Sequence, residues 1–314
     1  MSSADEQEDS EAHVNILAPT LGGKQFWADE LFFHEWHIQR NVFTGHYRLL
    51  DDKDFRHAWG TREECQARLD EIRQERKLPA MSGRAVVVLH GLMRSDSSMR
   101  RMARYLREQG KFSTFNVSYP STQGTVGDHA RALASILAGL EGIEEIHFVA
   151  HSLGNLVVRH YLADCQQAQP PRQPDPRIQR MVMLGPPNNG AQIAEVLLRN
   201  GLGKVIAGQS GQQLAREWTA LCDGMAIPAF PFGIIAGGRE QKRGYNPLLK
   251  GDNDAIVSVE SARLGGAADF VVLPVLHTTM MDNATVQQYT LRFLEQGYFV
   301  SAEDRKPIPL EAAE

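Results

Sequence analysis

From residue 84 onward the chain alternates short apolar runs with longer amphipathic segments. The short runs are rich in β-branched residues, which is typical of strands buried on both faces of a parallel sheet; they cover residues 85–89, 115–119, 146–149, 180–184, 232–236 and 270–273. Segments with apolar residues at helical spacing lie between them; they cover residues 96–109, 126–140, 283–296 and the stretch after 152. This alternation predicts an α/β fold whose mostly parallel sheet has helices on both faces.

A different pattern occupies residues 22–78. Residues 37–40 and 47–50 alternate in polarity on either side of a turn that ends at Gly45, which predicts a hairpin. Residues 56–59 form a further short run and are expected to be a third strand. The region is therefore expected to be a small module outside the main domain.

The module is also expected to contain a helix. Residues 61–64, TREE, form a capping-box sequence, which predicts a helix that begins there and runs to about Lys77. Aromatic side chains are usually buried, so four of them are expected to form the core of the module: Phe32, Phe33, Trp36 and Trp59.

The run EIHFVAHSLG, residues 145–154, places a serine between an expected strand and an expected helix. A turn this tight needs small residues two positions before and after the serine, because it presses them against the neighbouring strand and helix. Ala150 and Gly154 occupy these positions around Ser152. The pattern predicts a nucleophile elbow with Ser152 as a catalytic serine; a purely structural turn is the other interpretation.

A serine nucleophile needs a general base, and the base needs a carboxylate that orients it. In enzymes with this strand-turn-helix arrangement the chain order is serine, acid, histidine. Only His160 and His277 follow Ser152. The helix that leaves the turn carries His160 away from the serine, whereas His277 lies in a loop after the last expected strand. His277 is therefore the expected base.

The expected acid lies in the loop of residues 251–257. We assign it to Asp254, because the apolar residues 256–257 directly after it can anchor the loop; Asp252 is the alternative. The same sequence also suits an ordinary turn or, through its alternating Asp and Asn oxygens, a calcium site, although no further ligand follows at a recognisable spacing. The loop of residues 186–190, where related arrangements can carry the acid, has no carboxylate.

Attack on an ester carbonyl creates an oxyanion that needs positioned donors. The backbone N–H of Leu153, beside the serine at the start of the expected helix, is one candidate. The second is the N–H of Leu92 in the loop after residues 85–89, where Gly91 permits a close approach of the backbone.

Composition changes this picture little. The 314 residues are 42% hydrophobic and 23% charged, with a net charge of -5, which is ordinary for a globular protein and gives no indication of a nucleic-acid partner. Residues 1–21 begin with an acidic, polar stretch and are expected to be a disordered tail. No run of eighteen apolar residues occurs, so no transmembrane segment is expected.

The three cysteines, Cys65, Cys165 and Cys222, are odd in number and lack metal-ligand spacing. Reduced thiols of this kind favour a cytoplasmic protein over a disulfide-bonded secreted one. We expect neither a metal nor a cofactor.

Taken with these motifs, the chain resembles the lipase and esterase branch of the α/β-hydrolase superfamily, near bacterial triacylglycerol lipases and the soluble relatives of the GPI inositol-deacylase group. The resemblance covers residues 84–298 and leaves out residues 22–78 and the tail at 299–314. It rests on residues 90–92, 150–154, 185–190, 254–257 and His277. The chain departs from the family pattern at two positions: Ala150 stands in place of the first elbow glycine, and Ala255 in place of a glycine after the acid. Neither departure removes an atom that takes part in catalysis.

The resemblance implies hydrolysis of a small-molecule carboxylic ester or lipid through an acyl-enzyme. Acyl transfer to an alcohol or thiol, and thioester hydrolysis, use the same residues and stay open; so does a non-catalytic binding protein of the same fold. Residues 191–223 mix apolar helical segments with glycines at the place where such enzymes carry cap helices. They are expected to be a lid or a fixed cap.

Overall fold

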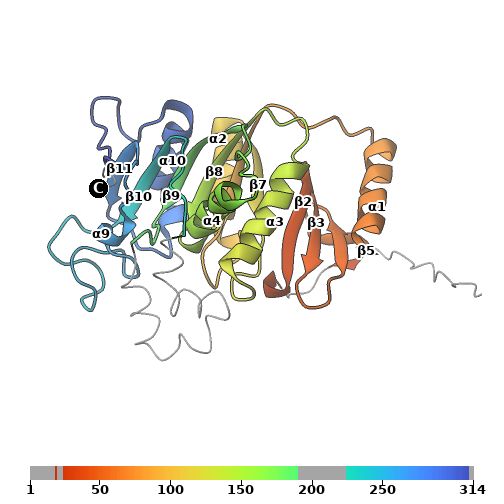
Figure 1. Cartoon of the computed structure of the whole chain (residues 1–314), viewed down its shortest axis with the longest axis horizontal. Coiled ribbons are helices and arrows are strands. Elements are labelled where there is room, and N and C mark those ends of the chain that lie inside the picture. The colour runs from red at the N-terminus through yellow and green to blue at the C-terminus, as the bar shows by residue number, and fades with distance from the viewer. Residues whose placement is uncertain (1–17, 20–23, 190–223, 311–314) are drawn as a thin grey trace, which may run out of the picture.

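The computed structural model describes residues 18–19, 24–189 and 224–310. Its centre is a six-stranded sheet with the strand order β11-β10-β9-β8-β6-β7 (Figure 1). Every neighbouring pair in this sheet is parallel. The strands are β6 (Arg84–Leu89), β7 (Ser113–Val117), β8 (Glu145–His151), β9 (Ile178–Leu184), β10 (Phe232–Gly237) and β11 (Asp269–Leu273). The expected α/β fold with a parallel sheet is confirmed.

Helices cover both faces of this sheet. α2 (Arg100–Gly110) and α10 (Ala284–Gln296) pack on one face, and α3 (Val126–Gly139) and α4 (Leu153–Gln167) on the other (Figure 1). Side chains of β6 divide between the two layers, because successive residues of a strand point to opposite faces: Val86 and Val88 join one hydrophobic core, and Ala85, Val87 and Leu89 join the other. Shorter helices, η2 (Asp96–Met99), α9 (Val259–Ala262) and η3 (Met280–Asp282), lie in the connections.

A second, antiparallel sheet, here called the N-terminal sheet, has the strand order β1-β5-β4-β3-β2. It consists of β1 (Ala18–Pro19), β2 (Trp27–Phe33), β3 (Trp36–Asn41), β4 (Tyr47–Leu50) and β5 (Phe55–Gly60), with η1 (Lys24–Phe26) before β2. The hairpin of β3 and β4 and the strand β5 match the expectation. β2 has no counterpart in the sequence pattern, because a register shift between Asp29 and Leu31 interrupts its two-residue period.

The helix of this module is α1 (Arg62–Glu75), and its expected capping box is formed: Thr61 and Glu64 cap each other's backbone N–H. Phe32, Phe33 and Trp36 are buried as expected. The prediction for Trp59 was wrong, since its side chain is 38% exposed. Ala58, its neighbour on β5, faces the core, so alternation along the strand turns Trp59 outward.

The ends of the described chain also pack. Ala18–Pro19 lies within the expected acidic tail, yet it pairs with β5. In the expected C-terminal tail Phe299 is buried, and Ile308 exchanges backbone hydrogen bonds with Gly266 and Ala267. The expected lid or fixed cap at 191–223 lies outside the described residues.

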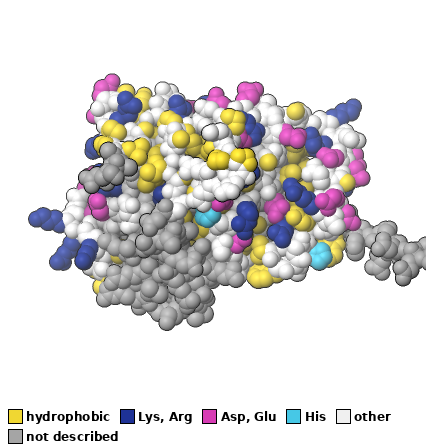
Figure 2. Space-filling view, viewed as in Figure 1, with side chains coloured by type: hydrophobic (Ala, Val, Ile, Leu, Met, Phe, Trp, Pro, Cys, Tyr) yellow, Lys and Arg dark blue, Asp and Glu magenta, His cyan; other side chains and the backbone are white. Residues whose placement is uncertain are grey.

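Charged side chains of both signs are interspersed on the face shown in Figure 2, in keeping with the net charge of -5. Within the described ranges, the structure contains no helix of the length and apolarity needed to cross a bilayer.

Candidate active site

Ser152 lies at the junction of β8 and α4 with a strained backbone. Its φ and ψ are 52° and -116°, a conformation that side-chain-bearing residues rarely adopt. Hydrogen bonds on both sides hold it there: its N–H donates to Leu184 O at 3.0 Å, and Asn155 donates to Ser152 O from its backbone N at 3.1 Å and from Nδ2 at 3.0 Å. Such strain persists only where surrounding contacts determine the backbone, and here it occurs at the carboxyl end of β8.

The two glycines nearest the turn have no room for a side chain. A Cβ on Gly154 would lie 2.8 Å from Leu89 Cβ and 3.0 Å from the carbonyl oxygen of Leu89. On Gly91 it would lie 2.9 Å from His151 Nδ1 and 3.1 Å from Ser152 Cβ. The loop after β6 therefore runs against the serine.

The structure brings Asp254 and His277 together. His277 Nδ1 donates to Asp254 Oδ2 at 2.7 Å, and the side chains of Asp254 and His277 are only 1% and 5% exposed. The backbone N–H of His277 also donates to Asp254 O at 2.9 Å. A proton on Nδ1 directed at the carboxylate leaves Nε2 as the nitrogen that can accept a proton, as a general base requires.

The loop that carries Asp254 is built around its carboxylate. Oδ1 accepts the backbone N–H groups of Ile256 at 3.0 Å and Val257 at 2.7 Å, which leaves Oδ2 for His277. Between them Ala255 has a φ of 87°, in the region that favours glycine. This explains geometrically why glycine suits the position where the sequence departs from the lipase pattern.

Neither of the competing residues lies at this pair. Asp252 accepts the N–H groups of Arg239 and Glu240, each at 2.8 Å, and so closes a different part of the loop. His160 forms an ion pair with Asp164 one helical turn further along α4, at 3.2 Å. Both side chains therefore make these contacts away from the Asp254–His277 pair.

Two supporting residues were not anticipated from the sequence. The ring of His151, next to the serine, lies 4.6 Å from that of His277, and its Nε2 donates to His277 O at 3.0 Å. Burial, and then the charge of His277, lower the pKa of His151 well below its usual value, so it stays neutral. Gly185 follows β9, and a Cβ there would lie 3.0 Å from His277 Nδ1. The available sequence signals were the adjacency of His151 to Ser152 and the place of Gly185 at the start of the 185–190 motif.

These contacts place Ser152 and His277 in one neighbourhood, since His151 touches the histidine ring and adjoins the serine. No hydrogen bond joins Ser152 Oγ to His277 within the described chain. Such bonds are often long in unliganded active sites and shorten when substrate binds.

The peptide between Gly91 and Leu92 is held from its carbonyl side. Gly91 O accepts from His90 Nδ1 at 2.9 Å and from Arg94 N at 3.3 Å. Because a trans peptide is planar, fixing its C=O fixes the opposite direction of its N–H, which belongs to Leu92. No described residue accepts a hydrogen bond from the backbone N–H of Leu92 or of Leu153, the two expected oxyanion donors.

Burial lowers the pKa of His90 to about 4, so its ring is neutral at pH 7. The ring accepts the N–H of Tyr119 at Nε2, at 3.4 Å, and therefore carries its proton on Nδ1, toward Gly91. Stacking of the His90 and Tyr119 rings, 4.1 Å apart, holds it further.

A cleft of about 600 Å³ lies elsewhere, between the N-terminal sheet and α2, and is lined by residues of both, including Asp29, Arg48 and Arg104. It does not include Ser152, Asp254 or His277. No cluster of three His, Cys, Asp or Glu side chains that could hold a metal occurs in the ranges described above.

Comparison with known proteins gives structural likeness only. No family model and no curated protein matches the chain. Among solved structures, a protein of Listeria innocua is 16% identical (TM-score 0.47; 73% of this chain and 99% of that one). Phospholipase PlaB of Legionella pneumophila is 17% identical (TM-score 0.48), over 68% of this chain but only 56% of its own. Est1E of Butyrivibrio proteoclasticus is 13% identical (TM-score 0.46), over 86% of this chain and 98% of its own.

Proposed function

We propose that the chain is a serine carboxylic-ester hydrolase that acts through an acyl-enzyme at Ser152. The observation that carries the proposal is the buried hydrogen bond between Asp254 and His277, 2.7 Å long, at the same sheet edge as the strained serine turn. Buried charge is costly unless it is paired. A carboxylate that is almost wholly buried and directed at one imidazole nitrogen supports a histidine that becomes charged during a reaction.

In the proposed first half-reaction Ser152 Oγ attacks the ester carbonyl carbon while His277 Nε2 takes the hydroxyl proton. Asp254 stabilises the resulting imidazolium through Nδ1. The carbonyl oxygen becomes an oxyanion that the N–H groups of Leu92 and Leu153 bind, and loss of one such donor typically costs about 2.7–4 kcal/mol of barrier. The tetrahedral intermediate then collapses: the bond to the alcohol oxygen breaks, and His277 gives that oxygen the proton.

In the second half-reaction a water molecule replaces the alcohol. His277 removes a proton from the water as it attacks the acyl carbon, the oxyanion forms again, and Ser152 Oγ leaves and regains the proton. The hydrogen bond from Nδ1 of His277 to Asp254 leaves Nε2 to exchange the proton in both steps. An alcohol or thiol in place of water would turn the same sequence into acyl transfer.

The experiment is hydrolysis of p-nitrophenyl esters over a series of acyl chain lengths. Ser152→Ala should retain its circular dichroism spectrum and lose at least about 10⁴-fold in kcat, as when the nucleophile of such a triad is removed. Ser301→Ala is the matched control, because Ser301 bonds to Asp304 in the C-terminal segment; it should keep wild-type kcat. A Ser152→Ala protein that turns over as fast as this control would overturn the mechanism.

A further inference from the structure

The N-terminal sheet touches the loop after β6 through one glutamine. Gln25, in η1, donates from Nε2 to Arg94 O at 2.8 Å. Its Oε1 accepts from Thr122 twice, from the backbone N at 3.2 Å and from Oγ1 at 2.9 Å. One side chain therefore joins two loops: residues 90–95, called the oxyanion loop below, and the loop after β7.

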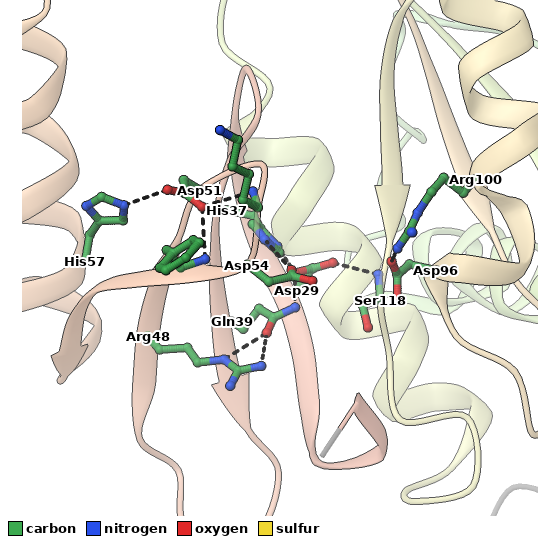
Figure 3. A network of polar contacts seen from close by, with 12 residues as sticks. Asp29, His37, Gln39, Arg48, Asp51, Asp54, His57, Asp96, Arg100 and Ser118 are labelled. Carbon is green, nitrogen blue, oxygen red and sulfur yellow. Dashed lines mark hydrogen bonds and ion pairs between the residues drawn. The ribbon is translucent and has the colours of Figure 1, made fainter. Parts of the chain in front are cut away.

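Asp29 of β2 makes a second connection, to the end of β7. Its backbone N–H donates to Ser118 O at 2.9 Å, and its Oδ2 accepts Ser118 N–H at 2.6 Å (Figure 3). Its Oδ1 accepts from His37 Nδ1 at 2.7 Å and from Gln39 Nε2 at 2.8 Å. Asp29 is 1% exposed. A buried carboxylate with three side-chain hydrogen bonds is rigid, so Ser118 is held closely to the N-terminal sheet.

Ser118 leads directly to the oxyanion loop. Tyr119, the next residue, donates from its backbone N–H to His90 Nε2 and from its hydroxyl to His90 O, and its ring stacks on that of His90. His90 in turn holds Gly91 O, and so sets the direction of the Leu92 N–H. The contacts run without a gap from Asp29 to the peptide that carries this donor.

We propose that the N-terminal sheet positions the oxyanion loop, with Gln25 and Asp29 as positioning residues for the Leu92 N–H. The inference rests on the proposed ester hydrolysis, and it gives residues 22–78 a role in that reaction. Neither residue touches the reacting atoms. Both act by keeping a donor in place before charge develops on the carbonyl oxygen, and displacement of a catalytic group by about 1 Å can cost up to about 10²-fold in rate.

The test uses the full-length chain with Gln25→Ala and Asp29→Asn, the second of which places an amide where Ser118 N–H needs an acceptor. Each is expected to lower kcat for a p-nitrophenyl ester by about 10- to 100-fold with little change in KM. The Ki of a trifluoromethyl ketone, whose adduct with the serine carries an oxyanion, should rise by the same factor as kcat falls, because transition-state analogues report the same contacts.

Glu35→Gln is the matched control. Glu35 also joins the N-terminal sheet to the main domain, through Arg107 of α2 at 2.6 Å. It takes no part in the contacts described above that lead from Gln25 and Asp29 to residues 90–95. It should leave kcat and Ki unchanged. A loss of kcat in Glu35→Gln equal to that in Gln25→Ala, or a fall in kcat without a matching rise in Ki, would overturn the proposal.

Hydrogen exchange gives a readout that does not depend on activity. Backbone amides of residues 90–95 should exchange faster in Gln25→Ala and Asp29→Asn than in wild type and Glu35→Gln, while those of β8 stay unchanged. If the wild-type chain hydrolyses no ester but this exchange pattern holds, the proposed function fails and the anchoring of the loop stands. Unchanged exchange at residues 90–95 would overturn the anchoring itself.

Discussion

In the described part of the chain, two buried aspartates, Asp254 and Asp29, each pair with a histidine in nearly the same geometry. Asp254 and His277 meet at 2.7 Å through Oδ2 and Nδ1, and Asp29 and His37 meet at 2.7 Å through Oδ1 and Nδ1. In both pairs the aspartate side chain is 1% exposed. Only their surroundings differ. The first pair lies near the strained serine turn, at the carboxyl ends of the parallel strands. The second pair lies in the antiparallel N-terminal sheet.

The difference shows that an Asp–His hydrogen bond does not by itself indicate catalysis. Asp29 uses its second oxygen to hold Ser118, and the charge of Asp29 and its hydrogen bond outweigh the effect of burial, so the pKa of His37 is raised. Asp254 uses its second oxygen to hold its own loop, through the backbone N–H groups of Ile256 and Val257. The same pair thus supports a structural contact in one sheet and, by our proposal, a general base in the other.

The largest contrast is expected between the two histidines. His277→Ala should lower kcat/KM for a p-nitrophenyl ester by at least about 10³-fold, because it removes the general base. His37→Ala should lower it less than about tenfold, since Asp29 keeps its bonds to Gln39 and Ser118. Steady-state kinetics on both purified variants make the comparison. Equal losses of kcat/KM in the two variants would contradict the assignment of a catalytic role to one pair and a structural role to the other.

The two aspartates of one loop sharpen the comparison further. Asp254→Asn should lower kcat by about 10³- to 10⁴-fold, because the amide cannot hold His277 in the required tautomer. Asp252→Asn should cost less than about tenfold in kcat, since Asp252 accepts only backbone N–H groups. Its effect should appear in the unfolding midpoint. Similar kcat losses in both variants would show that the wrong acid was chosen.

The smallest effect concerns pH and stability. Burial lowers the pKa of His90, His129 and His147 to about 4, and that of His151 well below its usual value. These groups take up protons on unfolding below pH 6.5, so stability is full above pH 6.5 and is lost as pH falls toward 4, at about 1.4 kcal/mol per pH unit for each histidine. The raised pKa of His37 gives the opposite dependence of stability on pH. The four histidines with lowered pKa outweigh this one group. Urea titrations from pH 7 to 5 should show the loss.

His147→Leu tests the assignment of this slope. Among the described residues neither ring nitrogen of His147 has a hydrogen-bond partner, Glu145 Oε2 lying 3.7 Å from Nε2, although His147 is 1% exposed. The leucine variant should be more stable than wild type by about 1–2 kcal/mol at pH 5, and by less at pH 7, with kcat unchanged. A stability difference that is the same at both values of pH would contradict the titration of His147.

The sequence predicts a feature well when that feature depends on residues that are close together along the chain. The six parallel strands, their helices and the serine turn were predicted because each depends on a few consecutive residues: the run at 145–154 alone contains the strand, the small residues and the serine. The order of residues along the chain also singled out His277 as the expected base. These are short-range or ordering constraints that one sequence carries.

The features that were missed depend on contacts between distant residues. β2 was not predicted because its bulge breaks the two-residue period, and Trp59 was placed in the core because its residue type outweighed its position in the strand. The connection from Asp29 to Ser118 joins residues 89 positions apart, and no local pattern at either residue indicates it. The role of Gly185 beside His277 likewise appears only in three dimensions.

The most direct test of the central claim is the site of covalent labelling by a fluorophosphonate. The account predicts a single phosphonyl adduct, located by peptide mass spectrometry on Ser152, that forms on the wild-type chain and on His37→Ala but is lost or strongly slowed in His277→Ala. An adduct on another residue, or labelling of His277→Ala at the wild-type rate, would contradict it.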